Sequence, residues 1–111
     1  MSDCLFCKIR DGELPSEIVN RADGFFAIRD IAPKADVHVL VIPDRHIDDF
    51  RGIGALSADE SKRFLEFVAD TARGCGLEEY RLVNYCGAGA GQTVFHLHVH
   101  VLGGRIQGMP A

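Results

Sequence analysis

Apolar and polar positions in the first third of the chain predict a short helix followed by a hairpin. Residues 4–11 (CLFCKIRD) can form a short helix that stops at the glycine that follows. Two strand-like runs, 17–21 and 25–29, flank Asp23-Gly24, which is a strong signal for a tight hairpin turn. We therefore expect two antiparallel strands here, preceded by one helical segment.

The middle of the chain predicts a buried strand and then the longest helix. Residues 37–43 (VHVLVIP) are apolar on both faces, which is typical of a central strand covered on both sides. Residues 44–56 have the character of a loop. Ser57 and Glu60 fit a capping box at the start of a helix over 57–74. Its expected apolar face comprises Phe64, Leu65, Phe67, Val68 and Ala72.

The last third of the chain predicts two strands joined by a glycine-rich loop. Residues 80–85 (YRLVNY) and 93–102 (TVFHLHVHVL) have strand character, and GAGAGQ over 87–92 connects them. The strands surround one long helix without the regular alternation of parallel βαβ units. We expect an α+β fold with a mainly antiparallel five-stranded sheet, as a single domain over residues 1–111.

Composition and charge narrow the classes of function. The chain is 47% apolar and 25% charged, which is ordinary for a globular domain. A net charge of −4 without a basic run argues against nucleic acid as a partner. The longest apolar run, VLVI, is too short to span a bilayer, and early acidic residues argue against a signal peptide. We therefore expect a cytoplasmic protein with reduced cysteines and no membrane partner.

Three of the five histidines occupy alternate positions of the last predicted strand. His96, His98 and His100 should therefore share one face, at spacings of about 7 Å, too far apart for all three to bind one metal without a bend. Histidine suits nucleophilic or acid–base chemistry because its unperturbed pKa is about 6.5. Three polar rings on a solvated sheet face, or a hydrogen-bonded row with only structural value, are the alternatives. The opposite face is expected to be core: Phe95, Leu97, Val99 and Val101.

The glycine-rich loop before these histidines is a candidate phosphate site. Gly87, Gly89 and Gly91 permit unusual backbone angles, and successive N–H groups can form an anion-binding nest. Taken alone, the glycines fit a plain flexible turn equally well. Next to Gln92, Thr93 and the histidines, a phosphate cradle is the better interpretation.

Cys4 and Cys7 have the spacing of a metal-binding or redox pair. A thioredoxin-like interpretation needs a βαβ context, which the pattern lacks. The pair supplies two ligands, whereas a closed tetrahedral zinc site needs four. Two buried thiols are the alternative. Cys75 and Cys86 lack ligand spacing with each other and are expected to be packing residues.

The run GQTVFHLHVHVL resembles the signature of the histidine triad (HIT) superfamily, His-φ-His-φ-His-φ-φ, in which φ is apolar. Comparable family motifs are matched by Cys4-Leu-Phe-Cys7-Lys-Ile, Gly12-Glu-Leu-Pro15, Ile28-Arg-Asp30-Ile-Ala-Pro33, His38-Val-Leu-Val-Ile-Pro43, His46 and Asn84. The ending Leu102-Gly-Gly-Arg105 resembles the Hint branch, the purine nucleoside phosphoramidate hydrolases. The resemblance implies a HIT-like fold, with one long helix and a short N-terminal helix beside the sheet.

The resemblance also implies a reaction. His98 corresponds to the family nucleophile, which attacks the α-phosphorus of a nucleotide and forms a covalent nucleotidyl-histidine that water hydrolyses. His100 would orient His98 or bind the phosphate. His38 corresponds to a histidine near the nucleophile, although a satisfied core ring also explains it. The implied enzyme hydrolyses purine nucleoside phosphoramidates or acyl-adenylates. The alternatives are a dinucleoside polyphosphate hydrolase or a mainly non-catalytic nucleotide-binding interaction module.

Further family positions imply how a nucleotide binds. Asp30 would accept hydrogen bonds from the ribose, and Asn84 would lie near the ribose and phosphate. Gly91, Gln92 and Thr93 would contact the phosphate or the leaving group. An apolar slot for the purine of AMP or GMP conjugates corresponds to Leu5, Phe6, Ile9, Ile28 and Ile31. Taken alone, each of these five would be interpreted as core.

The same resemblance completes the cysteine pair and implies an assembly. His46 and His96 correspond to two further ligands, so that Cys4, Cys7, His46 and His96 would bind a structural Zn²⁺. This ion would fix the N-terminal segment to the sheet and hold His96 away from the chemistry. A homodimer is implied as well, with the long helix and the strand over 80–85 as candidate interface elements.

Overall fold

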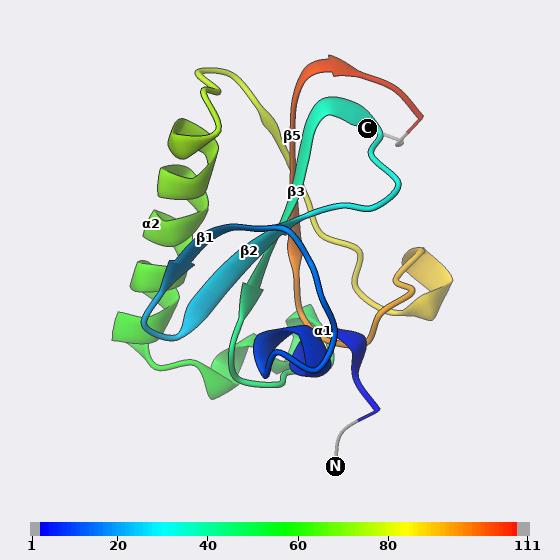
Figure 1. Cartoon of the computed structure of the whole chain (residues 1–111). Coiled ribbons are helices and arrows are strands. Elements are labelled where there is room, and N and C mark those ends of the chain that lie inside the picture. The colour runs from blue at the N-terminus through cyan, green and yellow to red at the C-terminus, as the bar shows by residue number, and fades with distance from the viewer. Residues whose placement is uncertain (1–2, 109–111) are drawn as a thin grey trace.

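In the computed structural model, which describes residues 3–108, five antiparallel strands form one sheet in the order β1-β2-β3-β5-β4 (Figure 1). The strands are β1 (Ile18–Ala22), β2 (Phe25–Arg29), β3 (Ala35–Pro43), β4 (Arg81–Val83) and β5 (Val99–Ile106). The helices are α1 (Leu5–Arg10) and α2 (Ala58–Gly74), with short 3₁₀ helices η1 (Phe50–Ala55) and η2 (Ala88–Ala90). The predicted α+β class with an antiparallel sheet is confirmed.

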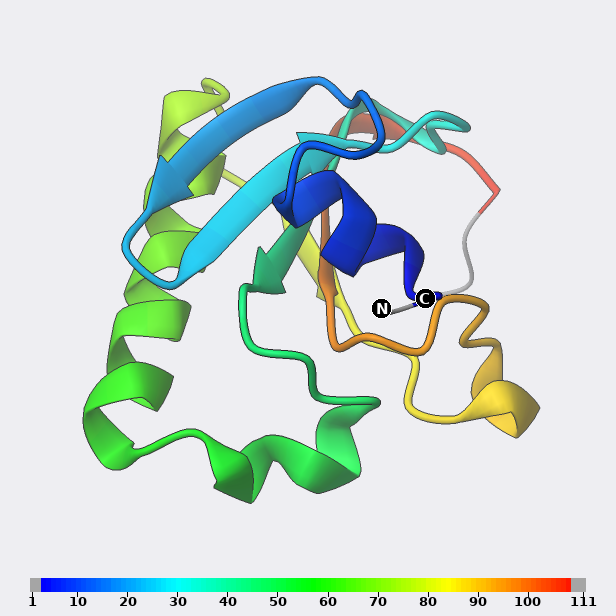
Figure 2. The same cartoon turned by 60° about the horizontal axis from the view of Figure 1, so that its bottom comes forward.

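The two faces of the sheet are covered by different helices (Figure 2). Side chains alternate along each strand, so neighbouring residues of β2 and β3 enter opposite cores. The core against α2 contains Phe64, Phe67, Val68 and Ala72 of the helix with Phe25, Ala27, Val39, Val41 and Val101. The core against α1 contains Phe6 and Ile9 with Phe26, Ile28, Leu40 and Ile42. His100 pairs with Leu40 in the β3–β5 register and therefore lies on the α1 face.

The long helix begins where the sequence predicts. Ser57 Oγ accepts a hydrogen bond from the N–H of Glu60, and Glu60 Oε1 accepts one from the N–H of Ser57, which completes the capping box. The prediction for Leu65 is wrong, because its side chain is 66% exposed. The buried face follows positions 64, 67, 68, 71 and 72, and Leu65 points away from that stripe.

The last strand begins later than predicted. Residues 93–98 are irregular, and β5 starts only at Val99. The N–H of Leu97 donates to the carbonyl of Ile47 at 2.6 Å, and Leu97 packs with Ile47 and Leu56 in a separate small core. This contact with the 44–56 loop draws the segment away from the sheet. Phe95, which was expected to be core, is consequently 49% exposed.

The length and polarity of the long helix can be compared with those of a membrane-spanning helix. Among residues 3–108 no helix is both long enough and apolar enough to cross a bilayer. The 17 residues of α2 carry charged side chains on the face that the sheet leaves uncovered, where Arg63 pairs with Asp59 and Arg73 with Asp70. This is the pattern of a helix packed on one side only.

Candidate active site

A cavity of about 490 Å³ opens on the α1 face of the sheet. Most of the residues predicted for catalysis and nucleotide binding line it: Leu5, Phe6, Ile9, Ile28, Asp30, Ile31, Gly91, Gln92, Thr93, His98 and His100. Phe6, Ile9 and Ile28 are buried, whereas Ile31 is 97% exposed. His38 and Asn84 are not among the lining residues and instead contact His100 and His98.

The main chain sets which nitrogen of His98 is available for chemistry. His98 Nδ1 lies 2.7 Å from the carbonyl oxygen of His96. A carbonyl only accepts, so Nδ1 carries the proton and Nε2 keeps its lone pair. Burial lowers the pKa of His98, which keeps the ring neutral. Asn84 Nδ2 donates to the carbonyl of His98 at 2.8 Å and fixes the backbone beside β4. The result is a neutral imidazole with an accessible nucleophilic nitrogen.

A second chain of hydrogen bonds ends at His100. The N–H of Lys34 donates to His38 Nδ1 at 3.0 Å, so the proton of the neutral His38 ring lies on Nε2. His38 Nε2 in turn donates to His100 Nδ1 at 2.9 Å, which leaves the proton of His100 on Nε2. Burial, with His98 and His38 nearby, lowers the pKa of His100 to about 4. His100 is therefore a neutral donor beside His98, oriented by the buried His38.

Asp30, at the end of β2, lies close to the hydrogen bonds that join Lys34, His38 and His100. Its Oδ1 accepts a hydrogen bond from the N–H of Ala32 at 2.8 Å, and its Oδ2 lies 3.4 Å from His38 Nε2. Ligand atoms of Asp30, His38 and His100 lie within 4.8 Å of one another. A metal bound at His38 Nε2 would need a lone pair there, yet Lys34 already uses the lone pair on Nδ1. We therefore interpret this group as a hydrogen-bond chain and not as a metal site.

The glycine-rich loop is held in shape from inside by Gln92, which is 5% exposed. Gln92 Oε1 accepts a hydrogen bond from the N–H of Gly87 at 2.7 Å. Its Nε2 donates to the carbonyls of Asp48 at 2.8 Å and Val94 at 3.0 Å. Gly91 has a φ of 103°, a left-handed conformation that favours glycine. The Gln92 amide is thus used within the protein, and the exposed Thr93 supplies the side-chain hydroxyl on this wall.

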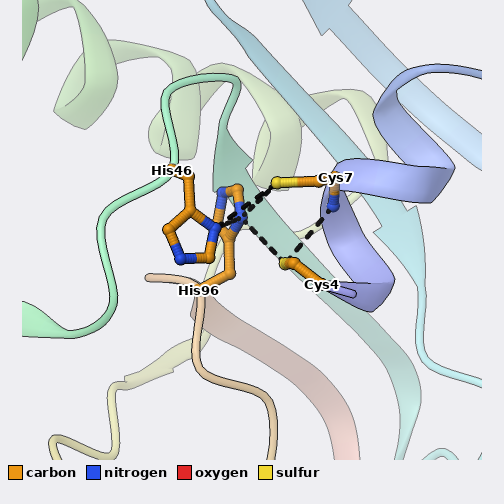
Figure 3. Close-up of side chains that lie close together, drawn as sticks. All are labelled: Cys4, Cys7, His46 and His96. Carbon is orange, nitrogen blue, oxygen red and sulfur yellow. Dashed lines mark hydrogen bonds between the residues drawn. The ribbon is translucent and has the colours of Figure 1, made fainter. Parts of the chain in front are cut away.

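The four predicted metal ligands converge beside the cavity (Figure 3). Cys4 precedes α1 and Cys7 lies within it, while His46 follows β3 and His96 precedes β5. Cys4 Sγ lies 3.3 Å from His96 Nδ1, Cys7 Sγ lies 3.4 Å from His46 Nδ1, and the two Nδ1 atoms are 3.1 Å apart. Neighbouring ligands of tetrahedral zinc lie roughly 3.3–3.8 Å apart. The geometry of this cluster is therefore close to that of a four-coordinate site.

The hydrogen-bond partners of Nε2 in His46 and His96 also favour a metal site. His96 Nε2 lies 2.8 Å from the carbonyl oxygen of Pro43, and His46 Nε2 lies 2.7 Å from Asp48 Oδ1. Both acceptors place the ring proton on Nε2 and leave the lone pair of each Nδ1 facing the cysteines. Metal-binding histidines are oriented by outer partners of this kind. The residues present therefore fit a metal ion, and the Cys₂His₂ donor set is one that zinc favours.

Several cavity residues were missed by sequence reasoning, namely Leu14, Pro15, Ser16, Arg29, Leu40, Tyr85 and Val94. Leu14 and Pro15 belong to a matched family motif, which was the signal available for them. Leu40 was correctly predicted as buried, but only its register next to His100 places it at the cavity. Tyr85 directly follows Asn84, and the strand-like run YRLVNY accounted for it without any role at the site.

Comparisons with known proteins agree with this geometry. The family model described as the HIT domain matches residues 11–107. A purine nucleoside phosphoramidase of Escherichia coli K12 is 37% identical over 105 residues, covering 93% of this chain and 88% of that protein. An uncharacterised HIT-like protein of Rickettsia prowazekii is 42% identical over 104 residues, with 91% and 87% covered.

Solved structures show the same likeness. A HIT family hydrolase from Clostridium thermocellum superposes with a TM-score of 0.83 at 39% identity, covering 99% of this chain and 97% of that one. A HIT family hydrolase from Legionella pneumophila gives 0.84 at 40% identity, with 97% and 98% covered. The family model, the close relatives and the shared fold lead to one conclusion: this chain belongs to the HIT family.

Proposed function

We propose that this protein hydrolyses purine nucleoside phosphoramidates or acyl-adenylates through a covalent intermediate on His98. One observation carries the proposal: His98 is a neutral ring at the cavity wall, with Nδ1 tied to the His96 carbonyl and Nε2 left as a nucleophile. The Escherichia coli relative is named a purine nucleoside phosphoramidase, which supports this class of substrate. The reaction belongs to nucleophilic catalysis, in which one difficult displacement becomes two easier ones.

The first step transfers the nucleotide to the enzyme. His98 Nε2 forms a bond to the α-phosphorus while the bond from phosphorus to the leaving group breaks. A departing amine takes up one proton from solvent, and the ring becomes positively charged. The Nδ1–H of His98 then makes a charge-assisted hydrogen bond to the His96 carbonyl, which stabilises that charge. Donation from His100 Nε2 stabilises the negative phosphoryl oxygens.

The second step restores the enzyme. Water attacks the phosphorus, the bond to Nε2 breaks, and one proton is released as the nucleoside monophosphate forms. His98 returns to its neutral form with the proton on Nδ1. Because the first and second displacements use the same donors, the hydrogen-bond chain through His38 and His100 serves both of them.

The remaining cavity residues suit a nucleotide. The purine would lie against the apolar side chains Leu5, Phe6, Ile9, Ile28 and Ile31. Asp30 would accept hydrogen bonds from the ribose hydroxyls, and Gly91, Gln92 and Thr93 would form the wall beside the phosphate. Asn84 would act through the His98 backbone, to which it donates. In this proposal the base would lie on α1 and the phosphate next to the two histidines.

We further propose a structural zinc ion on Cys4, Cys7, His46 and His96, and a homodimer. The ion would cross-link the start of α1 to the segment that follows β3 and the segment that precedes β5, and thereby hold the floor of the purine slot. The dimer follows from the family resemblance. Its candidate interface elements are α2 and β4, which carry the exposed apolar side chains Leu65 and Leu82.

A trapping experiment tests the reaction. The protein is incubated with adenosine 5′-phosphoramidate and quenched, and the adduct is mapped by mass spectrometry. We expect adenylation at His98 and a loss of turnover of at least about 10³-fold in His98→Ala. Phe50→Ala changes an exposed side chain on η1 and serves as the matched control. Turnover on diadenosine polyphosphates is measured in parallel. Unchanged turnover in His98→Ala, or no adduct on His98, would defeat the proposed mechanism.

A further inference from the structure

Tyr85 is an aromatic residue of the cavity that the proposed reaction does not use. Its ring meets the ring of His100 edge-on, with centroids 5.6 Å apart and an angle of 73° between the planes. It also borders Gly91, where an added Cβ would lie 3.5 Å from Tyr85 Cδ1. Tyr85 therefore stands between the donor histidine and the glycine-rich loop, directly beside the place proposed for the phosphate.

Four rings at the cavity contact one another in order, and this order indicates on which side of the histidines Tyr85 lies. Phe6 meets His98 with centroids 5.0 Å apart, His98 meets His100 at 5.1 Å, and His100 meets Tyr85 at 5.6 Å. Phe6 belongs to the apolar slot on α1, at the base end of the row. Tyr85 is at the other end, beyond both histidines. A group attached to the phosphorus on the side away from the nucleoside would therefore approach Tyr85.

We propose that Tyr85 forms a leaving-group subsite that favours an aromatic amine joined to the phosphorus by a short linker. The proposal rests on the proposed phosphoramidate hydrolysis and specifies its substrate class. Tyr85 is half-buried, so its ring is positioned yet still lines the cavity. Within residues 3–108 its hydroxyl makes no hydrogen bond to a protein group, so the ring is not committed to a polar contact. Aromatic pairs gain stability beyond simple burial, which an aliphatic leaving group cannot provide.

The linker must be short because Tyr85 borders the phosphate itself. A ring two or three bonds from the nitrogen can reach it. The second purine of a dinucleoside polyphosphate is separated from the α-phosphorus by further phosphates and a ribose, so its ring would extend past Tyr85. The structure therefore favours aromatic amines over dinucleotides at this subsite.

The test compares two substrates with matched amines. The 2-phenylethylamine and n-butylamine amidates of adenosine 5′-monophosphate both release unhindered primary alkylamines, so they differ mainly in the ring. We expect wild-type kcat/KM to be roughly three- to tenfold higher for the aromatic compound. Tyr85→Phe should keep this preference, whereas Tyr85→Leu and Tyr85→Ala should lose it. Inhibition by AMP should be unchanged in Tyr85→Phe, which keeps the ring.

A control variant and the contrary outcomes distinguish a failure of the Tyr85 subsite from a failure of the proposed function. Tyr80→Ala removes the other tyrosine, which is outside the cavity, and should keep the preference. An equal fall for both substrates in Tyr85→Leu would overturn the subsite, because Tyr85 would then only support His100. Equal wild-type rates for the two compounds would overturn it as well. No turnover of either compound would instead defeat the proposed function, and the subsite with it.

Discussion

His100 is a buried ring that must stay neutral to accept the hydrogen bond from His38. Its pKa in the folded protein is lowered to about 4 by burial and by the neighbouring His98 and His38. In the unfolded chain the same side chain titrates near its ordinary value of about 6.5. Between these values only the unfolded state gains a proton. The stability that depends on this ring is therefore full above about pH 6.5 and is lost progressively as the pH falls from there to about 4.

We predict from this that His100 alone lowers the free energy of unfolding by on the order of 3 kcal/mol as the pH falls from about 6.5 to 4. His100→Asn removes the titrating group, so its free energy of unfolding should depend less steeply on pH over this range. Urea denaturation at about pH 7, 5.5 and 4.5 measures both dependences. The same slope in the two proteins would contradict the prediction.

Most residues that the sequence predicted for the site line one cavity, but the sequence did not show how they are connected. The alternating histidines and the family resemblance were enough to single out His98 and His100. The contact between His38 and His100 joins positions 62 residues apart, and local patterns contain no information about it. The bond from His98 to the His96 carbonyl depends on a bend that a regular strand would not have. Tyr85 was missed because its segment was already explained as a strand.

Among the elements, the predictions held where the local sequence decides the structure. The capping box of α2 is such a case, because Ser57 and Glu60 satisfy each other's backbone within one turn. The start of β5 is the opposite case. Leu97 bonds to Ile47 in a distant loop, and that tertiary contact overrides the strand pattern of 93–98. The boundaries of helices and strands that depend on contacts between distant residues could therefore not be predicted from the sequence.

Gly103 of β5 packs closely against Leu77, which follows α2, and a substitution can test this contact. A Cβ added to Gly103 would overlap Leu77 Cδ2 and lie 2.6 Å from Leu77 Cδ1. We predict that Gly103→Ala destabilises the protein by about 1–3 kcal/mol. Thermal unfolding measures the effect, and Leu77→Ala in the same chain should recover part of it.

Gly74 provides the matched control for this substitution. It is the last residue of α2, and an added Cβ there would meet no atom within 4 Å. Gly74→Ala should therefore leave stability unchanged or raise it by up to about 1 kcal/mol. Equal effects of Gly74→Ala and Gly103→Ala would show that close packing of β5 is not the cause.

A substitution at the start of α1 can distinguish the proposed role of Cys4 as a metal ligand from its role as a helix cap. Cys4 Sγ accepts a hydrogen bond from the N–H of Cys7, and serine performs that capping role well. Cys4→Ser should therefore keep the cap but lose bound zinc, and lower the free energy of unfolding by at least roughly 2 kcal/mol. Metal analysis of protein purified without chelator, with thermal unfolding, measures both. Cys86→Ser is the matched control. No zinc in the wild type, with unchanged stability in Cys4→Ser, would contradict the metal site.

At the scale of the whole molecule, the β4 edge of the sheet and the long helix carry exposed apolar side chains. β4 is an edge strand of only three residues, and its Leu82 is 50% exposed. Leu65 on α2 is 66% exposed. Unpaired strand edges and exposed apolar side chains are features that a second subunit can cover. This pattern supports the proposed homodimer at these two elements.

We predict that Leu82→Arg converts the proposed dimer into a monomer, because it places a charge in the proposed interface. Size-exclusion chromatography with light scattering measures the molar mass of each protein. Phe50→Arg changes a side chain of similar exposure on η1 and should remain dimeric. A monomeric wild type, or a dimeric Leu82→Arg, would contradict the interface.

His96 belongs to two centres at once. Its ring faces Cys4 and His46, while its carbonyl oxygen holds the ring proton of His98. Agents that chelate the proposed metal or alkylate the thiols would therefore disturb the His98 ring through the His96 main chain, and would also loosen α1, which carries part of the purine slot. In steady-state kinetics such agents should lower kcat and raise KM for the nucleotide together.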